Sequence, residues 1–216
     1  METPDHISSL RRVGGNLALD FANTAEGTPE GEIEREHLLG YEDLVFWGHR
    51  VGLLSGENVE RLLRKGRERP AEADAVYARA LGFRGHLYRL FRAVVGGLSP
   101  PAESVEALRI FECEAISHAA LVPSGVDGFG WRWEQGDELA GVLWPVSHSA
   151  TELLTSGPVE RVKGCAGCNW IFVDESRNRS RRWCSMEDCG THAKMRRYVA
   201  RRAAKRKSSE NQNTSL

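Results

Sequence analysis

Four of the chain's five cysteines lie close together as two pairs. Cys165 and Cys168 form the first pair, Cys184 and Cys189 form the second, and fifteen residues separate the pairs. Thiolate is a preferred ligand of Zn²⁺, and a structural zinc site takes four tetrahedral ligands at about 2.3 Å. Two close pairs at this separation are typical of zinc sites. Because four thiolates leave no open coordination position, the spacing predicts one structural zinc ion and no catalytic metal.

The residues alone leave other uses of these thiols open. Four free cysteines could share this spacing by chance, and a close pair could take part in disulfide exchange. A redox sensor that releases zinc on oxidation is a further alternative, because neighbouring arginines can lower the pKa of a thiol. The fifth cysteine, Cys113, lies in an apolar helical stretch, where a buried apolar role is expected.

The segments around the cysteines are expected to form a hairpin. Residues 169–173 have strand composition and residues 174–178 have turn composition. Residues 181–184 would return as the second strand and deliver Cys184. In the turn between the first two cysteines, Gly167 is expected to ease the backbone because glycine tolerates positive φ.

A helix is expected over about residues 190–206, directly after Cys189. Its N-terminus would place partial positive charge beside the negatively charged zinc–thiolate centre. Met195 and Val199 would pack this helix against the hairpin. Such a unit is too small to be held by burial alone, and metal binding would supply about 10–16 kcal/mol of apparent free energy. The combination of knuckle, hairpin and helix resembles a treble-clef zinc finger.

The net charge of −1 conceals a split along the chain. Residues 1–160 carry 15 Lys and Arg against 25 Asp and Glu, whereas residues 161–207 carry 14 against 4. A basic segment of this kind is typical of nucleic-acid binding, because Lys and Arg neutralise phosphates and a helix fits the major groove of DNA. The candidate contacts are Arg177, Arg179, Arg181, Arg182, Lys194, Arg197, Arg201 and Lys205. The same charges could instead form a solvated face or dock against the acidic part of the chain.

Aromatic residues are interspersed with these basic ones. Trp170, Phe172, Trp183 and Tyr198 could stack on bases, but we expect them to form the small core of the finger.

Residues 1–157 are expected to form a mainly helical domain with a few strands, which makes the whole chain α+β. Apolar periodicity predicts helices at about 41–54, 55–69, 71–96, 103–120 and 146–156. The alternation of Leu17, Leu19 and Phe21 predicts an extended segment at 14–24, followed by a loop at 25–40. Further strands are predicted at 129–135 and 139–144, with a turn at 135–137. The polar residues 207–216 are expected to be disordered.

Polar residues near the predicted extended segment form a candidate ligand site. Asn16, Asp20 and Asn23 lie there, and Asp20 stands between two apolar residues, where a partly buried carboxylate could hold a small molecule. The alternative is that it caps or anchors a neighbouring loop. Trp131, Trp133 and Trp144 could line a pocket or belong to the core.

Several classes of protein are disfavoured. No run of about 18 apolar residues is present, so no membrane span is expected. The first residues lack the apolar segment of a secretory signal, so the chain is expected in the cytoplasm. No P-loop, nucleophile elbow or dinucleotide fingerprint occurs, and the histidines have no mutual short spacing, so neither an enzyme nor a second metal site is expected.

Two stretches resemble known families. GCAGCNWIFVDESRNRSRRWCSMEDCGTHAKMRRYVARR resembles the CGNR zinc finger, and GGNLALDFANT resembles the opening of the ABATE domain that precedes this finger in bacterial proteins. The resemblance covers nearly the whole chain and implies a stress-induced transcription regulator. It implies a ligand-binding domain over residues 1–157 and a DNA-binding treble-clef finger over residues 161–206. The same finger could instead bind RNA or another protein, because fold does not fix function.

The chain departs from the CGNR signature in one place. Cys189 and Gly190 are kept, but Thr191 and His192 stand where the family has Asn and Arg. If the family's arginine contacts phosphate, His192 could replace it only in part and in a pH-dependent way, since an unperturbed histidine titrates near about 6.5.

Overall fold

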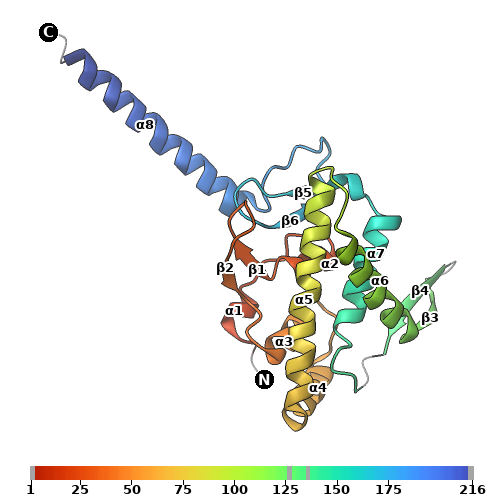
Figure 1. The fold of residues 1–216 in the computed structure, drawn as a ribbon. Coiled ribbons are helices and arrows are strands. Elements are labelled where there is room, and N and C mark those ends of the chain that lie inside the picture. Colours follow the sequence, from red (N-terminus) through yellow and green to blue (C-terminus); the bar gives the residue numbers. More distant parts are fainter. Residues whose placement is uncertain (1–2, 126–127, 135–136, 214–216) are drawn as a thin grey trace.

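The computed structural model describes residues 3–125, 128–134 and 137–213, with residues 204–213 described by their backbone alone. The N-terminal body, residues 3–157, is mostly helical and carries small two-stranded sheets, as expected (Figure 1). Its helices are α1 (Asp5–Ser8), α2 (Leu17–Ala22), α3 (Tyr41–Arg50), α4 (Gly56–Glu68), α5 (Pro70–Val95), α6 (Ala102–Ser117) and α7 (Leu143–Thr155). Its strands are β1 (Ala25–Gly27), β2 (Ile33–Glu36), β3 (Ala119–Ser124) and β4 (Gly128–Trp133).

The cysteine region, residues 161–190, follows the body and leads into one long helix. Its elements are β5 (Val162–Gly164), β6 (Ile171–Val173) and a π-helical turn η2 (Met186–Gly190), and the short 3₁₀ turn η1 (Val159–Arg161) precedes them. The long helix α8 (Thr191–Asn213) then leaves the rest of the molecule (Figure 1). The structure therefore has the expected order of a helical body, a hairpin with four cysteines, and a helix.

The core of the body is built around α5. Helices α2, α3, α4 and α6 pack against it, and α7 packs against α2 and α6. Aromatic rings make the central contacts: Phe83 stacks on Phe111 with ring centroids 3.9 Å apart, and Phe21 lies 5.1 Å from Trp47. Since Phe21 belongs to α2, these contacts fix the segment that carries the candidate ligand residues.

The predicted helices α3 to α6 are confirmed, because local signals mark their ends. Ser55 caps α4 by accepting a hydrogen bond from the Asn58 N–H at 3.2 Å, and Pro70 stands in the first turn of α5, where its missing N–H costs nothing. Helix α7 begins at Leu143, within the range predicted as a strand at 139–144, and that strand prediction is wrong.

The extended segment predicted at 14–24 is also wrong, since residues 17–22 form α2. The Asn16 side chain accepts hydrogen bonds from the N–H groups of Ala18 at 2.9 Å and Leu19 at 3.4 Å, which starts a helix. Almost every side chain of α2 is buried. A helix buried on all sides shows no polar face, so its apolar pattern can imitate alternation.

Residues 25–40 contain the antiparallel hairpin β1–β2 where a loop was predicted. The predicted strand at 129–135 corresponds to β4, but its partner is the preceding strand β3, with Leu121 opposite Trp131. Residues 135 and 136 of the predicted turn lie outside the described residues.

The hairpin of the cysteine region differs from the predicted one. Strand β6 pairs with β5, which precedes the first cysteine, and residues 181–184 form no strand. That segment is held instead by side chains, chiefly those of Asp174 and Arg181.

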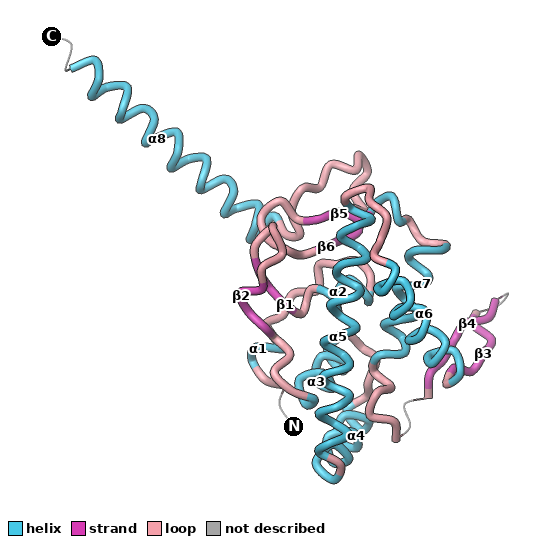
Figure 2. The backbone as a smooth tube through the Cα atoms, in the orientation of Figure 1, coloured by secondary structure: helices cyan, strands magenta, loops and turns pink. Residues whose placement is uncertain are grey.

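Helix α8 does not pack on the hairpin. Met195 is 56% exposed and Val199 is 60% exposed, so the predicted packing of these side chains is wrong. The tube in Figure 2 shows α8 projecting from the body along most of its length. It runs to Asn213, into the segment expected to be disordered, because residues 191–213 contain no glycine or proline and are rich in helix formers. Within the described residues, no helix has both the length and the apolar character needed to cross a membrane.

Candidate metal centre and basic surface

The turn between β5 and β6 carries the first two cysteines. The Cys165 N–H donates to the Trp170 carbonyl at 2.8 Å, which closes the turn, and the Ala166 N–H donates to the Arg182 carbonyl at 3.0 Å. The second bond brings the segment before Cys184 against the turn. A side chain at Gly167 would have little room, because its Cβ atom would lie 3.0 Å from the Cβ of Cys189. Its φ is not positive, so the reason predicted for this glycine is wrong, and close approach requires it instead.

The second pair of cysteines frames the turn η2. Ser185 caps this turn, because its hydroxyl accepts from the Asp188 N–H at 3.3 Å and its carbonyl accepts from the Gly190 N–H at 3.0 Å. Arg11 of the N-terminal body clamps the same turn, with Nη1 2.6 Å from a carboxylate oxygen of Asp188 and 3.0 Å from the Ser185 hydroxyl. The fourth cysteine is therefore positioned partly by the body.

The four sulfur atoms come together at one point. All lie within 4.8 Å of one another, with Cys168 Sγ 3.6 Å from Cys184 Sγ and Cys184 Sγ 3.8 Å from Cys189 Sγ. A tetrahedron of thiolates at about 2.3 Å from zinc has edges of about 3.8 Å. The donor set and its geometry therefore fit one zinc ion, as the spacing predicts. In the described part of the chain, this is the one group of three or more His, Cys, Asp or Glu side chains that could hold a metal.

The pKa shifts of the clustered thiols also indicate that the site binds a cation. Hydrogen bonds from the Cys168 and Cys184 thiols, with the N–H groups of Cys184 and Gly167, lower the pKa of Cys165. Hydrogen bonds with the Cys165 and Cys168 sulfur atoms, and then burial, raise the pKa of Cys184, because a second thiolate beside the first is unfavourable in a buried site. Four adjacent thiolates are stable only with a bound cation, and zinc supplies that charge.

The loop over residues 174–183 is fixed by one buried carboxylate. Asp174 accepts from the Ser176 N–H at 2.9 Å and the Arg181 N–H at 3.0 Å, and Lys163 Nζ lies 2.7 Å away. Burial raises the pKa of Asp174, but Lys163 and these donors outweigh it, so the net pKa is lowered and the group stays ionised. Lys163 also binds the Arg179 carbonyl, and Arg179 has a φ of 49°.

Arg181 differs from the other candidate phosphate contacts. Its guanidinium donates to the carbonyl of Trp183 at 3.0 Å and of Val13 at 3.3 Å, binds the carbonyl of Cys184, and lies 4.3 Å over the Phe172 ring. Its hydrogen-bonding capacity is used within the protein, so it stabilises the metal site.

The remaining candidates lie on the surface. Arg177, Arg179 and Arg182 are exposed on the loop, although Arg179 is 3.4 Å from Glu160. Lys194, Arg197 and Arg201 are exposed on α8, and Lys205 is described by its backbone alone. Sequence reasoning missed two further exposed basic residues of α8, Arg196 and Arg202, because it followed one stripe of the helix.

The aromatic residues divide between core and surface. Trp170 and Phe172 are buried, as expected, and Trp183 is half-buried below Arg182. Tyr198 is 55% exposed on α8, so it does not belong to the core.

Of the candidate ligand residues, Asn16 and Asp20 line a depression of about 620 Å³ together with Arg12. Asp20 is buried, accepts from the Gly14 N–H at 2.8 Å and lies 3.9 Å from Arg12. Burial raises the pKa of Asp20, and the Gly14 N–H and Arg12 partly offset this. Asn23 does not line the depression, because its side chain binds Ile171.

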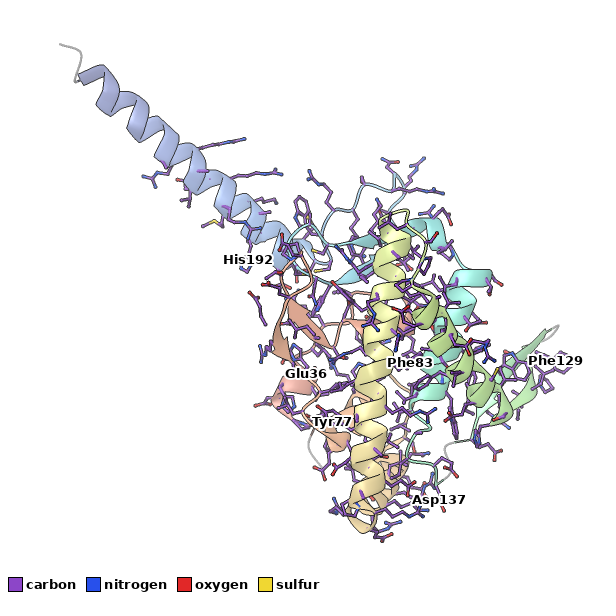
Figure 3. All side chains as sticks on the ribbon, in the orientation of Figure 1. Glu36, Tyr77, Phe83, Phe129, Asp137 and His192 are labelled. Atoms are coloured by element: carbon purple, nitrogen blue, oxygen red, sulfur yellow. The ribbon has the colours of Figure 1, made fainter. Side chains whose placement is uncertain are left out.

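The remaining side chains of interest are three tryptophans and Cys113. Trp133 donates to the Ala115 carbonyl at 2.8 Å, and Trp144 is buried and stacks on His118 at 4.1 Å. Trp131 is 41% exposed. Cys113 is exposed, so the prediction of a buried cysteine is wrong, because it lies on the outer side of α6. Figure 3 shows the β3–β4 hairpin carrying Phe129 away from α5.

The depression nearest the metal centre measures about 450 Å³ and is lined by Cys168, Cys189 and His192, with Glu26 and Arg11 of the body. His192 is exposed at the base of α8 (Figure 3). His192, one of the two residues that depart from the CGNR signature, therefore faces solvent beside the metal site.

Comparison with known proteins adds two matches. The family model ABATE, described as "Putative stress-induced transcription regulator", matches residues 15–157. The model of the CGNR zinc finger matches residues 161–202. No curated protein sequence matches the chain.

Proposed function

Since the chain belongs to the ABATE family and carries a CGNR zinc finger, we propose that it is a transcription regulator that binds DNA through its finger and a small ligand through its N-terminal body. In this proposal it acts by binding, without catalysis, in the cytoplasm. The two functional parts are residues 1–157 and 161–206.

The observation that carries the DNA proposal is the exposed basic surface of α8. Lys194, Arg196, Arg197, Arg201 and Arg202 are all exposed on a helix of 23 residues, which is about 35 Å long. A helix with its side chains is about 10–12 Å wide, and the major groove of B-DNA is about 12 Å wide. Helix α8 projects from the body, so it could enter the groove without a rearrangement of the body (Figure 2).

The zinc-held turn supports the same proposal by orienting the helix. Helix α8 begins at Thr191, two residues after Cys189, so the metal fixes its first turn. Arg177 and Arg182 on the adjacent loop remain exposed and could contact phosphates beside the groove. Arg181 takes no part in this surface, because its donors are used inside the protein.

The ligand part of the proposal is supported by the depression at Arg12, Asn16 and Asp20. It combines a carboxylate, a guanidinium and an amide with the apolar side chains of Leu17, Val51 and Leu53. Few polar groups on an apolar lining are typical of small-molecule sites.

Selection of bound sequences from a random DNA pool, with zinc measured on the same sample, tests the DNA proposal. We expect enrichment of a specific sequence by protein that contains one zinc per chain. Gel shifts on that sequence should weaken steeply as salt rises. Absence of binding to any duplex at low salt would overturn the proposal, and a preference for RNA in competition would favour an RNA-binding role.

A redox-sensing role is a second candidate, favoured by the partial exposure of Cys168 and Cys189, which line the depression of about 450 Å³. An oxidant could reach these thiolates and release the zinc. Zinc that stays bound under mild peroxide would exclude this role.

A further inference from the structure

A small cavity lies where the N-terminal body meets the cysteine region. Its volume is about 120 Å³. Tyr88 and Leu81 of α5 line it together with the turn of the β1–β2 hairpin and Asn169, the residue directly after Cys168. The rest of its lining is largely apolar and includes Ala22 and Ala25. The cavity is therefore bounded by both parts of the protein.

Two polar atoms in the lining have unused hydrogen-bonding capacity. Asn169 Oδ1 and the Tyr88 hydroxyl oxygen are shielded from solvent, and neither has a hydrogen-bond partner among the described residues. Asn169 is 3% exposed and cannot turn away, because its Nδ2 donates to the Ala25 carbonyl at 3.2 Å and its N–H to the Gly27 carbonyl at 3.1 Å. Buried polar atoms are normally paired, so these two point to a molecule that pairs with them.

The two atoms require different hydrogen-bonding groups in a bound molecule. Asn169 Oδ1 can only accept, so its partner must donate. The Tyr88 hydroxyl can donate, and burial raises its pKa, which keeps it protonated at neutral pH. Gly31, which has a φ of +100°, leaves the space beside the Tyr88 hydroxyl open. A Cβ atom at residue 31 would lie 3.3 Å from the hydroxyl oxygen.

The charge in the lining is already neutralised. Arg84 Nη1 lies 2.6 Å from Glu36 Oε1 and 3.0 Å from the Thr24 hydroxyl. Because this ion pair leaves no net charge, a neutral occupant is favoured over an ionised one.

We propose that the cavity binds a small neutral molecule with a hydrogen-bond donor beside an acceptor on a short apolar body, which is the chemistry of a carboxamide. The donor faces Asn169 Oδ1, the acceptor faces the Tyr88 hydroxyl, and the alkyl part lies on Ala22, Ala25 and Leu81. The volume equals that of about four liquid waters at about 30 Å³ each, which suits a molecule of about five non-hydrogen atoms.

Occupancy would join the body to the metal site. Asn169 stands between Cys168 and Trp170, and the Trp170 indole N–H also donates to the Ala25 carbonyl, at 3.0 Å. A molecule that bridges Tyr88 and Asn169 therefore stabilises this junction. The effect of this molecule on DNA binding rests on the proposed function, whereas its binding to the cavity does not.

Saturation-transfer NMR on the full zinc-loaded chain tests the site with two probes of the same shape. Propionamide carries the donor and the acceptor, and 2-butanone replaces the NH₂ group by a methyl group. We expect propionamide to bind with a Kd on the order of 1–10 mM and 2-butanone about two- to tenfold more weakly, which corresponds to one lost hydrogen bond. Equal binding of the two probes, or a crystal soaked with propionamide that shows only ordered water in the cavity, would overturn the proposal.

Two tyrosines of α5 provide matched variants. Tyr88→Phe removes the unpartnered hydroxyl, so it should weaken propionamide binding about two- to tenfold and leave the unfolding midpoint unchanged. Tyr77→Phe removes a hydroxyl that already donates to the Leu38 carbonyl at 2.7 Å, so it should lower the midpoint and leave propionamide binding unchanged. The reverse pattern would contradict the site.

DNA binding is measured separately from these probes. If the chain binds DNA, saturating DNA should change the propionamide affinity by the factor by which propionamide changes the DNA affinity. If the chain binds no DNA, the proposed function fails while the NMR result on the cavity still stands.

Discussion

Asn23 of α2 binds the backbone of Ile171 in β6 with two hydrogen bonds. Its Oδ1 accepts from the Ile171 N–H at 2.9 Å, and its Nδ2 donates to the Ile171 carbonyl at 2.8 Å. The amide thus takes the place of a neighbouring strand along the edge of β6. The Val173 N–H donates to the Gly14 carbonyl at 2.8 Å on the same edge. The strand that carries the metal turn is therefore completed by the N-terminal body.

Replacing Asn23 tests this junction. In Asn23→Ala the buried N–H and carbonyl of Ile171 lose their partners, which costs about 1–3 kcal/mol for each unsatisfied group. We expect the free energy of unfolding from urea titration to fall by at least that amount. Asn178→Ala, on the exposed part of the loop, is the control and should change it by less than about 0.5 kcal/mol. Equal effects of the two substitutions would show that the junction contributes little.

Removal of one cysteine tests the metal centre. Cys184→Ser should abolish stoichiometric zinc binding, measured by elemental analysis, and cause loss of the fold around β5 and β6, because metal binding supplies about 10–16 kcal/mol in such units. Cys113→Ser is the matched control, since Cys113 is exposed and does not belong to the four-cysteine cluster. It should keep one zinc per chain. Zinc that stays bound in Cys184→Ser would contradict the four-thiolate centre.

How much of the structure can be predicted from the sequence depends on whether each signal lies within a short stretch of the chain. The four cysteines and the helices α3 to α6 could be predicted, because ligand spacing, apolar period and capping residues lie within short windows. Helix α2 could not, since Asn16 starts it while its buried surroundings conceal its period. The roles of Asn23, Asn169 and Arg181 depend on partners that lie more than 140 residues away in the sequence. The pairs are Asn23 with Ile171, Asn169 with Ala25 and Arg181 with Val13, and no local pattern encodes those contacts.

Asp20 gives a pH-dependent prediction. Burial raises its pKa above the ordinary value of 3.8, so the folded chain holds the proton more tightly than the unfolded chain. The native state is therefore penalised as pH rises above 3.8 and through the folded pKa, and the penalty is then constant. Asp20→Asn stays neutral and can still accept from Gly14, so its stability relative to wild type should rise as the pH increases from 3.8 through the folded pKa of Asp20. A difference in unfolding free energy that is constant with pH would refute this.

Arg181 and Arg182 are neighbours with different expected roles. Arg181→Ala removes charged donors from the carbonyls of Val13, Trp183 and Cys184, so it should lower the free energy of unfolding by about 1.5–3 kcal/mol. Arg182→Ala, at an exposed position, should change stability by less than about 0.5 kcal/mol and weaken DNA binding. Denaturant titration and gel shifts on both variants separate the roles. A stable Arg181→Ala protein with weakened DNA binding would place this arginine on the nucleic-acid surface instead.

Helix α8 gives the most direct test of the DNA interface, because its basic side chains are exposed and their loss should not disturb the fold. Arg197→Ala and Arg201→Ala should each remove one phosphate contact, weaken binding similarly on all sequences, and lower the slope of log Kd against log salt by about 0.9. The control is Arg64→Ala. Arg64 is also exposed and belongs to α4, which lies at the end of the body opposite α8 (Figure 1). It should leave the slope unchanged, because a charge farther away than the Debye length of about 8–10 Å is screened. If all three variants lowered the slope equally, the binding would reflect net charge alone and α8 would not be the interface.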